Sequence, residues 1–231
     1  MNKDYGSERF FFENRITRPC HRQVNEEIFD FFFQLSRESK ILDVGCGDGF
    51  FLFFLRELGF IDIKGVDVCP SFIIRCREKI LNAEMVDIIE YKTDKKFDLI
   101  TLIELLEHVK EPEAVLKHVN GLLKENGQIL ITVPILDSLS SKWSRLRKKT
   151  TRLSQCQAID ETHLNAFTRN LIFAIIVKAG FIVKKWSYCY NPLPYRFRKI
   201  LSSRTYDTLS RITLFNTCGD SLFIVAEKPK R

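Results

Sequence analysis

Apolar runs of strand length alternate with segments of helical period through the middle of this chain. Strands are predicted at Ile41–Val44, Ile61–Val68, Phe97–Ile103 and Gln128–Val133, and a short one is predicted within Glu84–Ile89. Between them, apolar side chains recur at helical spacing, which predicts helices at Phe50–Leu58, Pro70–Leu81 and Pro112–Leu123. This alternation predicts an α/β, doubly wound sheet with a ligand crevice at the carboxyl ends of the strands.

The segments on either side of this core carry patterns of their own. Apolar residues recur at helical spacing from His21 to Arg37, which predicts an amphipathic helix that packs on the core or covers the ligand pocket. Thr168 leads into another predicted helix, which Gly180 ends. Two further strands are predicted at Phe181–Tyr190 and Ser221–Glu227.

Three glycines spaced by one residue follow the first predicted strand. A strand, a tight turn containing Gly45, Gly47 and Gly49, and then a helix let backbone N–H groups approach a nucleotide-like ligand closely. A dinucleotide-binding G-x-G-x-x-G turn would need its third glycine at Phe50. Asp43 places a carboxylate in the same crevice. That placement suits a cofactor with a cationic amino group better than it suits a pyrophosphate.

Acidic residues follow the next two predicted strands. Asp67 lies 18 residues beyond Gly49, close to the offset at which a carboxylate meets ribose hydroxyls in βαβ nucleotide folds. One carboxylate can accept hydrogen bonds from both the 2′- and the 3′-hydroxyl. A solvated loop aspartate is the plainer interpretation of Asp67. Asp87 lies at or just past the end of the third predicted strand.

Three groups of residues resemble motifs of one enzyme family. The glycine turn is similar to motif I of the class I S-adenosylmethionine-dependent methyltransferases. Leu106-Glu107-His108-Val109 after the fourth strand, and His163-x-x-x-Phe-Thr before a helix, resemble the small-molecule branch, which includes the ubiquinone-biosynthesis O-methyltransferases. The resemblance is strong over residues 40–134 and moderate over 160–190 and 220–228. It implies a Rossmann-like, seven-stranded sheet, mostly parallel with an antiparallel C-terminal strand, and helices on both faces.

The resemblance also implies S-adenosyl-L-methionine as the methyl donor and S-adenosyl-L-homocysteine as the product. In the family, the glycine turn binds the methionine part, and an acidic residue after the third strand accepts the adenine amino group. Asp87 matches that position, although the loop after it is shorter than usual and lacks the common proline. The cofactor-binding residues expected on this basis are Asp43, Gly45, Cys46, Gly47, Gly49, Asp67, Val68, Asp87, Ile88, Ile103 and Glu104.

The implied reaction is in-line transfer of a methyl group from a sulfonium, in which positioning and desolvation supply much of the acceleration. A general base helps only where the acceptor holds its proton at neutral pH, as a hydroxyl does. His108 and His163 are the candidate bases, and packing or loop hydrogen bonding would explain each of them equally well. Glu104 and Glu107 flank the same crevice, where either could contact the cofactor's amino group or the acceptor.

The composition of the chain limits the classes of partner, metal site and cellular location, but it does not identify a substrate. The net charge of +7 permits an acidic partner without requiring one. The seven cysteines show neither paired C-x-x-C spacing nor histidine clustering, which is typical of intracellular thiols.

No run of Asp, Glu or His outside the cofactor motifs suggests a catechol-type magnesium site, so we predict metal independence. No apolar run reaches the ~18–20 residues of a membrane span, and the charged start is not a secretory signal, so we expect a cytoplasmic protein.

Two basic, aromatic segments interrupt the pattern and are interpreted as substrate-side insertions. Ser138–Ile159 contains six Lys or Arg residues and no acidic residue. Such segments favour an anionic or lipid-linked small-molecule acceptor, or peripheral contact with an anionic membrane, while a solvated charged surface is the plainer interpretation. The oligomeric state stays open. We expect one domain, 1–231, made of a helical segment at 1–38, a cofactor-binding core at 40–134, and insertions at 138–160 and 191–216.

Three other functions fit parts of the sequence. An RNA methyltransferase would use the basic insertions, but enzymes that act on exocyclic base amines carry Asn/Asp-Pro-Pro-aromatic after the fourth strand. Here that position reads Ile103-Glu104-Leu105-Leu106, so nucleic acid is not the expected partner, although a 2′-O or ring-carbon RNA enzyme stays open. A cofactor-binding scaffold without transfer activity would not need every cofactor position intact. A dehydrogenase fits the glycine spacing poorly.

Overall fold

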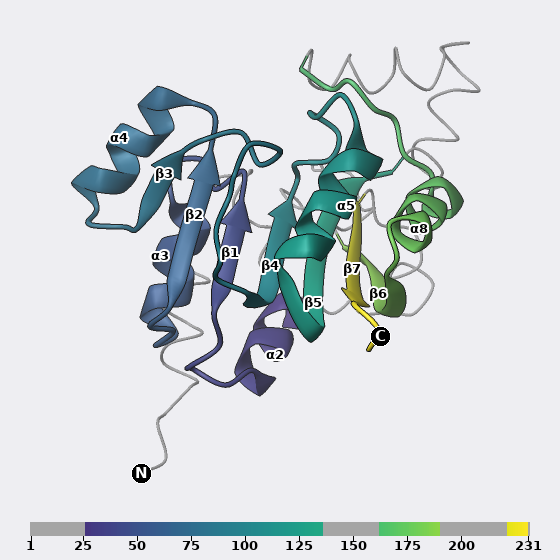
Figure 1. The fold of residues 1–231 in the computed structure, drawn as a ribbon, viewed down its shortest axis with the longest axis horizontal. Coiled ribbons are helices and arrows are strands. Elements are labelled where there is room, and N and C mark those ends of the chain that lie inside the picture. The colour runs from purple at the N-terminus through teal and green to yellow at the C-terminus, as the bar shows by residue number, and fades with distance from the viewer. Residues whose placement is uncertain (1–25, 136–161, 190–220, 231) are drawn as a thin grey trace, which may run out of the picture. The chain divides into compact units, whose positions relative to one another are not determined.

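The computed structural model describes residues 26–135, 162–189 and 221–230 (Figure 1). The two basic segments that the sequence predicts as insertions therefore lie outside the described residues. The chain divides into two compact units, Met1–Ser36 and Arg37–Arg231. In the first unit, helix α2 (Glu26–Gln34) lies inside the helix predicted from His21 to Arg37.

The second unit is built on a seven-stranded sheet. Its strands are β1 (Ile41–Val44), β2 (Ile63–Asp67), β3 (Ala83–Met85), β4 (Phe97–Ile103), β5 (Leu123–Pro134), β6 (Ile182–Cys189) and β7 (Ser221–Glu227). They lie in the order β3-β2-β1-β4-β5-β7-β6. The pairs from β3 to β5 are parallel, whereas β7 runs antiparallel to both β5 and β6. The predicted sheet, mostly parallel with an antiparallel C-terminal strand, is confirmed.

Different helices cover the two faces of the sheet. They are α3 (Phe50–Glu57), α4 (Pro70–Glu78), α5 (Pro112–Leu122) and α8 (Arg169–Lys178). Successive residues of a strand point to opposite faces. Gly65 of β2 lies under Leu52 of α3, whereas the next residue, Val66, belongs to an apolar cluster with Val115 of α5 and Ile172 of α8. Figure 1 accordingly shows α5 and α8 in front of the sheet and α3 behind β1 and β2.

The bounds of β3 and β5 show how strand pairing and turns set the ends of the strands. β3 begins at Ala83 and stops at Met85, just before Asp87 as predicted, because the chain turns at Asp87, whose carbonyl accepts the backbone N–H groups of Glu90 and Tyr91. β5 begins at Leu123 rather than Gln128, because Leu123 still pairs with Phe97 across an irregularity in the ladder. These differences leave the carboxyl ends of β1, β2 and β4 where the sequence places them.

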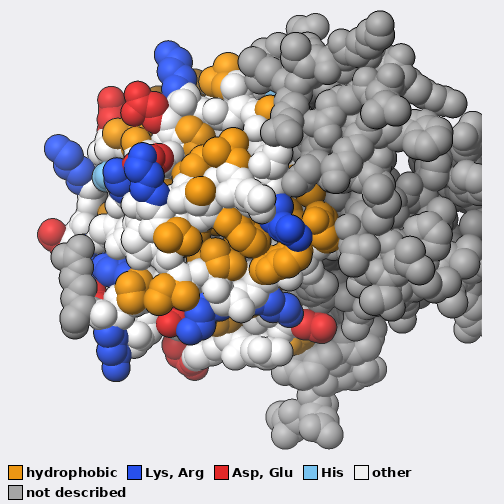
Figure 2. All heavy atoms as spheres, turned by 90° about the vertical axis from the view of Figure 1, so that its right-hand side faces the viewer, with side chains coloured by type: hydrophobic (Ala, Val, Ile, Leu, Met, Phe, Trp, Pro, Cys, Tyr) orange, Lys and Arg blue, Asp and Glu red, His pale blue; other side chains and the backbone are white. Residues whose placement is uncertain are grey.

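Helix α8 and the edge strand β6 present an apolar surface. Its exposed large side chains are Leu171, Val177, Ile182 and Trp186. Figure 2 views the protein from this side and shows apolar side chains gathered there, with Lys and Arg among them. The Trp186 ring meets the rings of Phe173 and Tyr188 edge to face, each at 5.7 Å between centroids. Within the described residues, none of the helices is both long and apolar enough to cross a bilayer.

The packing over β2 generates the first prediction. A Cβ on Gly65 would lie 2.6 Å from Leu52 Cδ1 and 2.8 Å from Cys46 Cβ. The Cys46 Cβ is attached directly to the backbone, so Gly65→Ala pushes the turn that carries Cys46 away from β2. We expect this substitution to lower the free energy of unfolding by about 1–3 kcal/mol, as overpacking of a core does. Urea unfolding followed by circular dichroism measures the change.

The matched control is Gly121→Ala in α5, where a new Cβ would meet no atom of 26–135, 162–189 or 221–230 within 4 Å. Alanine costs less conformational entropy than glycine in a helix, so this variant should be more stable by about 0.5–1 kcal/mol. Equal effects of the two substitutions would contradict the close packing described at Gly65.

Candidate active site

The glycine turn follows β1 directly and adopts left-handed backbone geometry at each glycine. The φ angles of Gly45, Gly47 and Gly49 are 72°, 53° and 81°. A Cβ on Gly45 would lie 2.7 Å from Leu105 Cδ1, because the loop after β4 packs against the turn. At Gly47, by contrast, no atom of the described residues lies within 4 Å of the place of a Cβ, so that part of the chain leaves the backbone there open to a ligand.

Asp67 ties this turn to the end of β2. Its Oδ2 accepts the backbone N–H of Gly47 at 2.9 Å, and its Oδ1 accepts that of Cys69 at 2.8 Å. The carbonyl of Val66 accepts two further N–H groups, from Gly45 at 2.8 Å and Cys46 at 3.1 Å. The predicted ribose-binding carboxylate therefore lies directly against the glycine turn. The next residue along the chain, Val68, has an exposed side chain.

Asp43 is a buried carboxyl within the sheet. It pairs in register with Gly65 of β2 and Thr101 of β4, and the Thr101 hydroxyl donates to its Oδ1 at 2.6 Å. Burial raises the pKa of Asp43 to about 7, the Thr101 hydrogen bond lowers it, and the nearby Asp67 raises it again. A cationic ligand group beside Asp43 would favour its charged form.

The Cys46 side chain packs inside the protein. It belongs to an apolar cluster with Leu52, Ile73, Cys76 and Leu81. Burial, followed by the nearby Asp43, raises the pKa of the Cys46 thiol far above its ordinary value, so this thiol stays neutral. Its expected part in cofactor binding stays a prediction, and only its backbone is available for that role.

The two residues expected at the adenine end have different environments. Asp87 is exposed, and its Oδ1 accepts the backbone N–H of Ile89 at 3.0 Å. Ile88 is buried at 6% exposure and packs in the main apolar cluster. The backbone N–H of Val86, just before them, donates to the carbonyl of Asp67 at 3.1 Å. The candidate ribose and adenine positions are therefore joined by a backbone hydrogen bond.

Strand β4 ends at Ile103, and the chain turns sharply at Glu104, whose φ of 48° is uncommon for a residue other than glycine. The Glu104 N–H donates to the carbonyl of Thr132 at 2.9 Å and to its hydroxyl at 3.1 Å, which holds this turn in place. Burial raises the pKa of the Glu104 carboxyl to about 7, while hydrogen bonding by Thr132 lowers it. Its Oε1 is buried and has no hydrogen-bond partner among the described residues.

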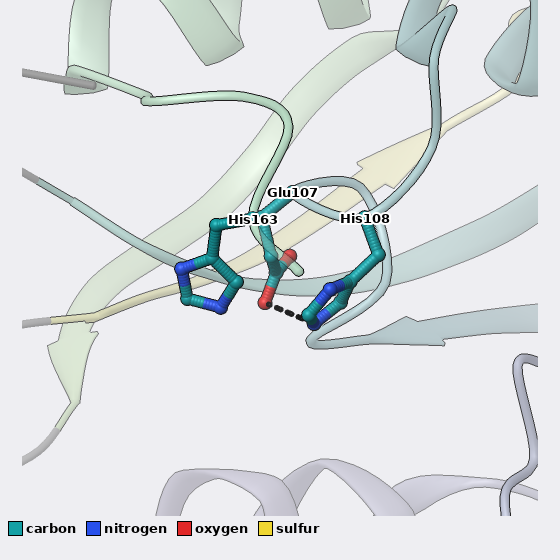
Figure 3. Close-up of side chains that lie close together, drawn as sticks. All are labelled: Glu107, His108 and His163. Carbon is teal, nitrogen blue, oxygen red and sulfur yellow. Dashed lines mark ion pairs between the residues drawn. The ribbon is translucent and has the colours of Figure 1, made fainter. Parts of the chain in front are cut away.

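Three side chains meet just beyond this turn. The ligand-capable atoms of Glu107, His108 and His163 all lie within 4.8 Å of one another. Glu107 is 1% and His163 7% exposed, whereas the His108 side chain is 33% exposed. Figure 3 shows the carboxylate between the two imidazole rings, with His108 Nε2 at 3.9 Å from Glu107 Oε1.

Backbone hydrogen bonds join the two segments that carry these side chains. The carbonyl of Glu107 accepts the N–H groups of Leu164 at 2.7 Å and Asn165 at 3.0 Å. The Asn165 amide also donates to the carbonyls of Leu106 and Val109, at 3.2 and 2.5 Å. The two candidate catalytic histidines are therefore held on segments with a fixed relative position.

The arrangement fits the cofactor that the sequence motifs imply. The buried oxygen of Glu104, the backbone of Gly47 and the carboxylate of Asp67 follow three neighbouring strands at the same edge of the sheet. Thr101 hydrogen-bonds to Asp43 and Thr132 to Glu104, and sequence reasoning missed both of these threonines. A hydroxyl inside an otherwise apolar, buried strand is the signal that could have identified them.

The raised pKa of Asp43 generates a prediction about stability. The native state binds this proton more tightly than the unfolded chain, so the associated stability is present below about pH 4 and is lost as the pH rises to about 7. Asp43→Asn has no proton to lose. Over that range its free energy of unfolding should therefore rise relative to the wild type by about 1.4 kcal/mol per pH unit.

Urea unfolding of both proteins at about pH 5 and about pH 8 measures this difference. Asp94→Asn is the matched control, because it removes a carboxyl that is exposed to solvent. A difference between Asp43→Asn and wild type that is the same at both pH values would contradict the raised pKa.

Comparison with known proteins identifies the family. A family model described as "Methyltransferase domain" matches residues 13–184. The chain is 30% identical over 130 residues to the ubiquinone biosynthesis O-methyltransferase of Histophilus somni, covering 50% of this chain and 54% of that protein. It is 30% identical over 113 residues to the tRNA U34 carboxymethyltransferase of Nautilia profundicola, covering 45% and 37%. The chain spans about half the length of the first curated relatives it matches.

The fold also has solved counterparts. A SAM-dependent methyltransferase from Archaeoglobus fulgidus superimposes with a TM-score of 0.65 over 95% of this chain and 99% of that chain, at 23% identity. This likeness supports the fold, and the family model covers well over half of the sequence. The chain therefore belongs to the methyltransferase domain family, which confirms the resemblance of its motifs to the S-adenosylmethionine-dependent methyltransferases.

Proposed function

We propose that this protein transfers a methyl group from S-adenosyl-L-methionine to an oxygen atom of a small-molecule acceptor. The observation that supports this proposal most is that the glycine turn after β1 lies against the histidine-bearing segment after β4, the neighbouring strand. The glycine turn after β1 is open at Gly47, and the segment after β4, which packs on that turn through Leu105, carries His108 beside His163. A turn alone would suit a binding protein, whereas polar side chains placed to hold an acceptor beside it suit an enzyme.

In this proposal the cofactor lies across the ends of β1, β2 and β3. Its methionine part lies on the glycine turn, where the carboxyl groups of Asp43 and Glu104 attract its amino group. Asp67 accepts the ribose hydroxyls, because each of its oxygens accepts one backbone N–H and keeps a further lone pair. Asp87 and the backbone of Ile88 bind the adenine.

The acceptor lies on the side of His108 and His163. An oxygen acceptor is favoured because two of the relatives are ubiquinone biosynthesis O-methyltransferases. One of the two imidazoles accepts the proton of the acceptor hydroxyl as a general base. The resulting oxyanion attacks the methyl carbon, so that the new O–C bond forms as the S–C bond breaks and neutral S-adenosyl-L-homocysteine departs.

The charge of the chain supports an anionic or lipid-linked acceptor. Ser138–Ile159 supplies six cationic side chains without an acidic one. On the described surface, Lys184 and Lys185 are exposed on β6 beside the apolar side chains of α8 and β6. This combination suits peripheral contact with an anionic membrane by a cytoplasmic protein.

RNA is the second candidate acceptor, because one relative is named as a tRNA-modifying enzyme. Incubation of the protein with a cell extract and methyl-labelled cofactor distinguishes the candidates. We expect the label in small molecules that organic solvent extracts and ribonuclease leaves intact. Label in RNA would support the second candidate. Cofactor binding without any transfer would show a scaffold instead.

Asp67 provides a test of the cofactor site. Asp67→Asn keeps the shape of the side chain but turns an NH₂ group toward one of the two backbone N–H donors. Hydrogen bonds to charged groups contribute about 1.5–3 kcal/mol each, so S-adenosyl-L-homocysteine should bind at least about tenfold more weakly. Isothermal titration calorimetry measures the affinity, with Asp94→Asn as the exposed control. Unchanged affinity would remove Asp67 from the cofactor site.

His108 provides a separate test of the acceptor side. His108→Ala should lower turnover by about 100-fold or more, while the Kd for S-adenosyl-L-homocysteine changes little. His118→Ala is the matched control, since His118 lies on α5 and contacts the carbonyl of Tyr91. If cofactor binding collapses while the bound complex still turns over normally, His108 belongs to the cofactor site instead.

A further inference from the structure

We propose that Glu107, His108 and His163 form a binding site for one divalent transition-metal ion, with Zn²⁺ as the best match. Two imidazoles and one carboxylate are a common donor set of catalytic zinc, which leaves further positions open to water or substrate. The same donor set occurs in non-haem iron sites, so the chemical class is a borderline-soft divalent cation rather than Mg²⁺ or Ca²⁺.

The separations of the donor atoms support this site. All three side chains offer ligand atoms within 4.8 Å of one another. Ligands at about 2.0–2.2 Å from one zinc ion lie roughly 3–3.6 Å apart, so small side-chain rotations complete the site. The 3.9 Å between His108 Nε2 and Glu107 Oε1 is too long for a hydrogen bond, yet close to the separation of two ligands that share an ion.

Neighbouring groups orient the His108 ring toward the cluster. The hydroxyl oxygen of Thr162 lies 2.9 Å and its carbonyl oxygen 3.3 Å from His108 Nδ1. An Nδ1–H that donates to the carbonyl leaves the lone pair on Nε2, which is the nitrogen that faces Glu107. Metal-binding histidines are usually oriented in this way by a carbonyl or carboxylate on the other ring nitrogen.

Burial supplies the electrostatic reason for a cation. The Glu107 carboxylate is 1% exposed and lies between two imidazole rings (Figure 3). Burying a carboxylate is unfavourable unless positive charge or hydrogen bonds compensate, and a divalent ion held by both histidines would supply that charge. The 33% exposure of His108 leaves the cluster accessible from one side, so an acceptor could reach an open coordination position.

This inference rests on the proposed function but changes the part of the two histidines, which hold the ion while the acceptor proton passes to water. An acceptor hydroxyl bound to the ion loses its proton to water more readily, because the positive charge stabilises the oxyanion. The oxygen then attacks the methyl carbon as the S–C bond breaks, and the step involves no oxidation or reduction. The expectation of metal independence considered only runs of neighbouring residues. This cluster is assembled from two distant segments of the chain, so this proposal replaces that expectation.

Metal uptake by the full chain tests the proposal directly. The protein is treated with a chelator, loaded with Zn²⁺ or Co²⁺ and separated from free metal, after which the bound metal is counted by mass spectrometry. The visible spectrum of bound Co²⁺ reports its coordination. We expect about one ion per chain in wild type, and binding weaker by more than about 100-fold in Glu107→Gln and His163→Gln. His118→Gln, outside the cluster, should bind like wild type.

His108→Gln keeps the test decisive if the buried variants fail to fold, because this ring is partly exposed. Calorimetry with S-adenosyl-L-homocysteine on each variant shows that the cofactor site is intact. No uptake by wild type, or uptake that all three cluster variants retain, would overturn the metal site while leaving the proposed function standing. Metal uptake without any binding of S-adenosyl-L-homocysteine would instead overturn the proposed function and leave the metal site standing.

Discussion

The contact between the glycine turn and the end of β2 is the constraint on which the rest of the candidate site depends. Asp67 accepts the N–H of Gly47, and the carbonyl of Val66 accepts the two N–H groups before it. This close approach is possible because Gly65 has no Cβ where the Cys46 thiol packs on β2. A bulkier residue there would separate the turn from Asp67, and with it the two ends of the cofactor in our proposal.

Buried carboxyl groups give this edge of the sheet its electrostatic character. Burial raises the pKa of both Asp43 and Glu104 to about 7, and Glu107, which follows Glu104 in the loop after β4, is almost fully buried. Such groups become charged more readily when a cation binds nearby. S-adenosyl-L-methionine carries a sulfonium and an ammonium group, so an acid-lined edge suits it even in a chain with a net charge of +7. The basic segments would then serve the acceptor rather than the cofactor.

The cofactor side could be predicted from the sequence because it depends on local patterns. Apolar runs place β1 and β4, and the spacing of Gly45, Gly47 and Gly49 requires a tight turn between strand and helix. The partners that hold it were not predictable in this way. Thr101 reaches Asp43 through strand pairing, and Thr132 reaches Glu104 from β5, so both depend on sheet order. The ends of β3 and β5 also depended on pairing and turns that no local pattern displays.

The acceptor side was the harder part to predict because it is built from loops. Glu107 and His108 lie after β4, and His163 lies before α8, so only tertiary structure brings them together. The parallel bridge between Ile135 and Phe167, together with the N–H groups that the Glu107 carbonyl accepts, fixes the second loop against the first. Loops on a rigid sheet can change while the cofactor turn stays constant. In our proposal, the choice of acceptor therefore depends on these two loops and the basic segments, rather than on the strand ends assigned to the cofactor.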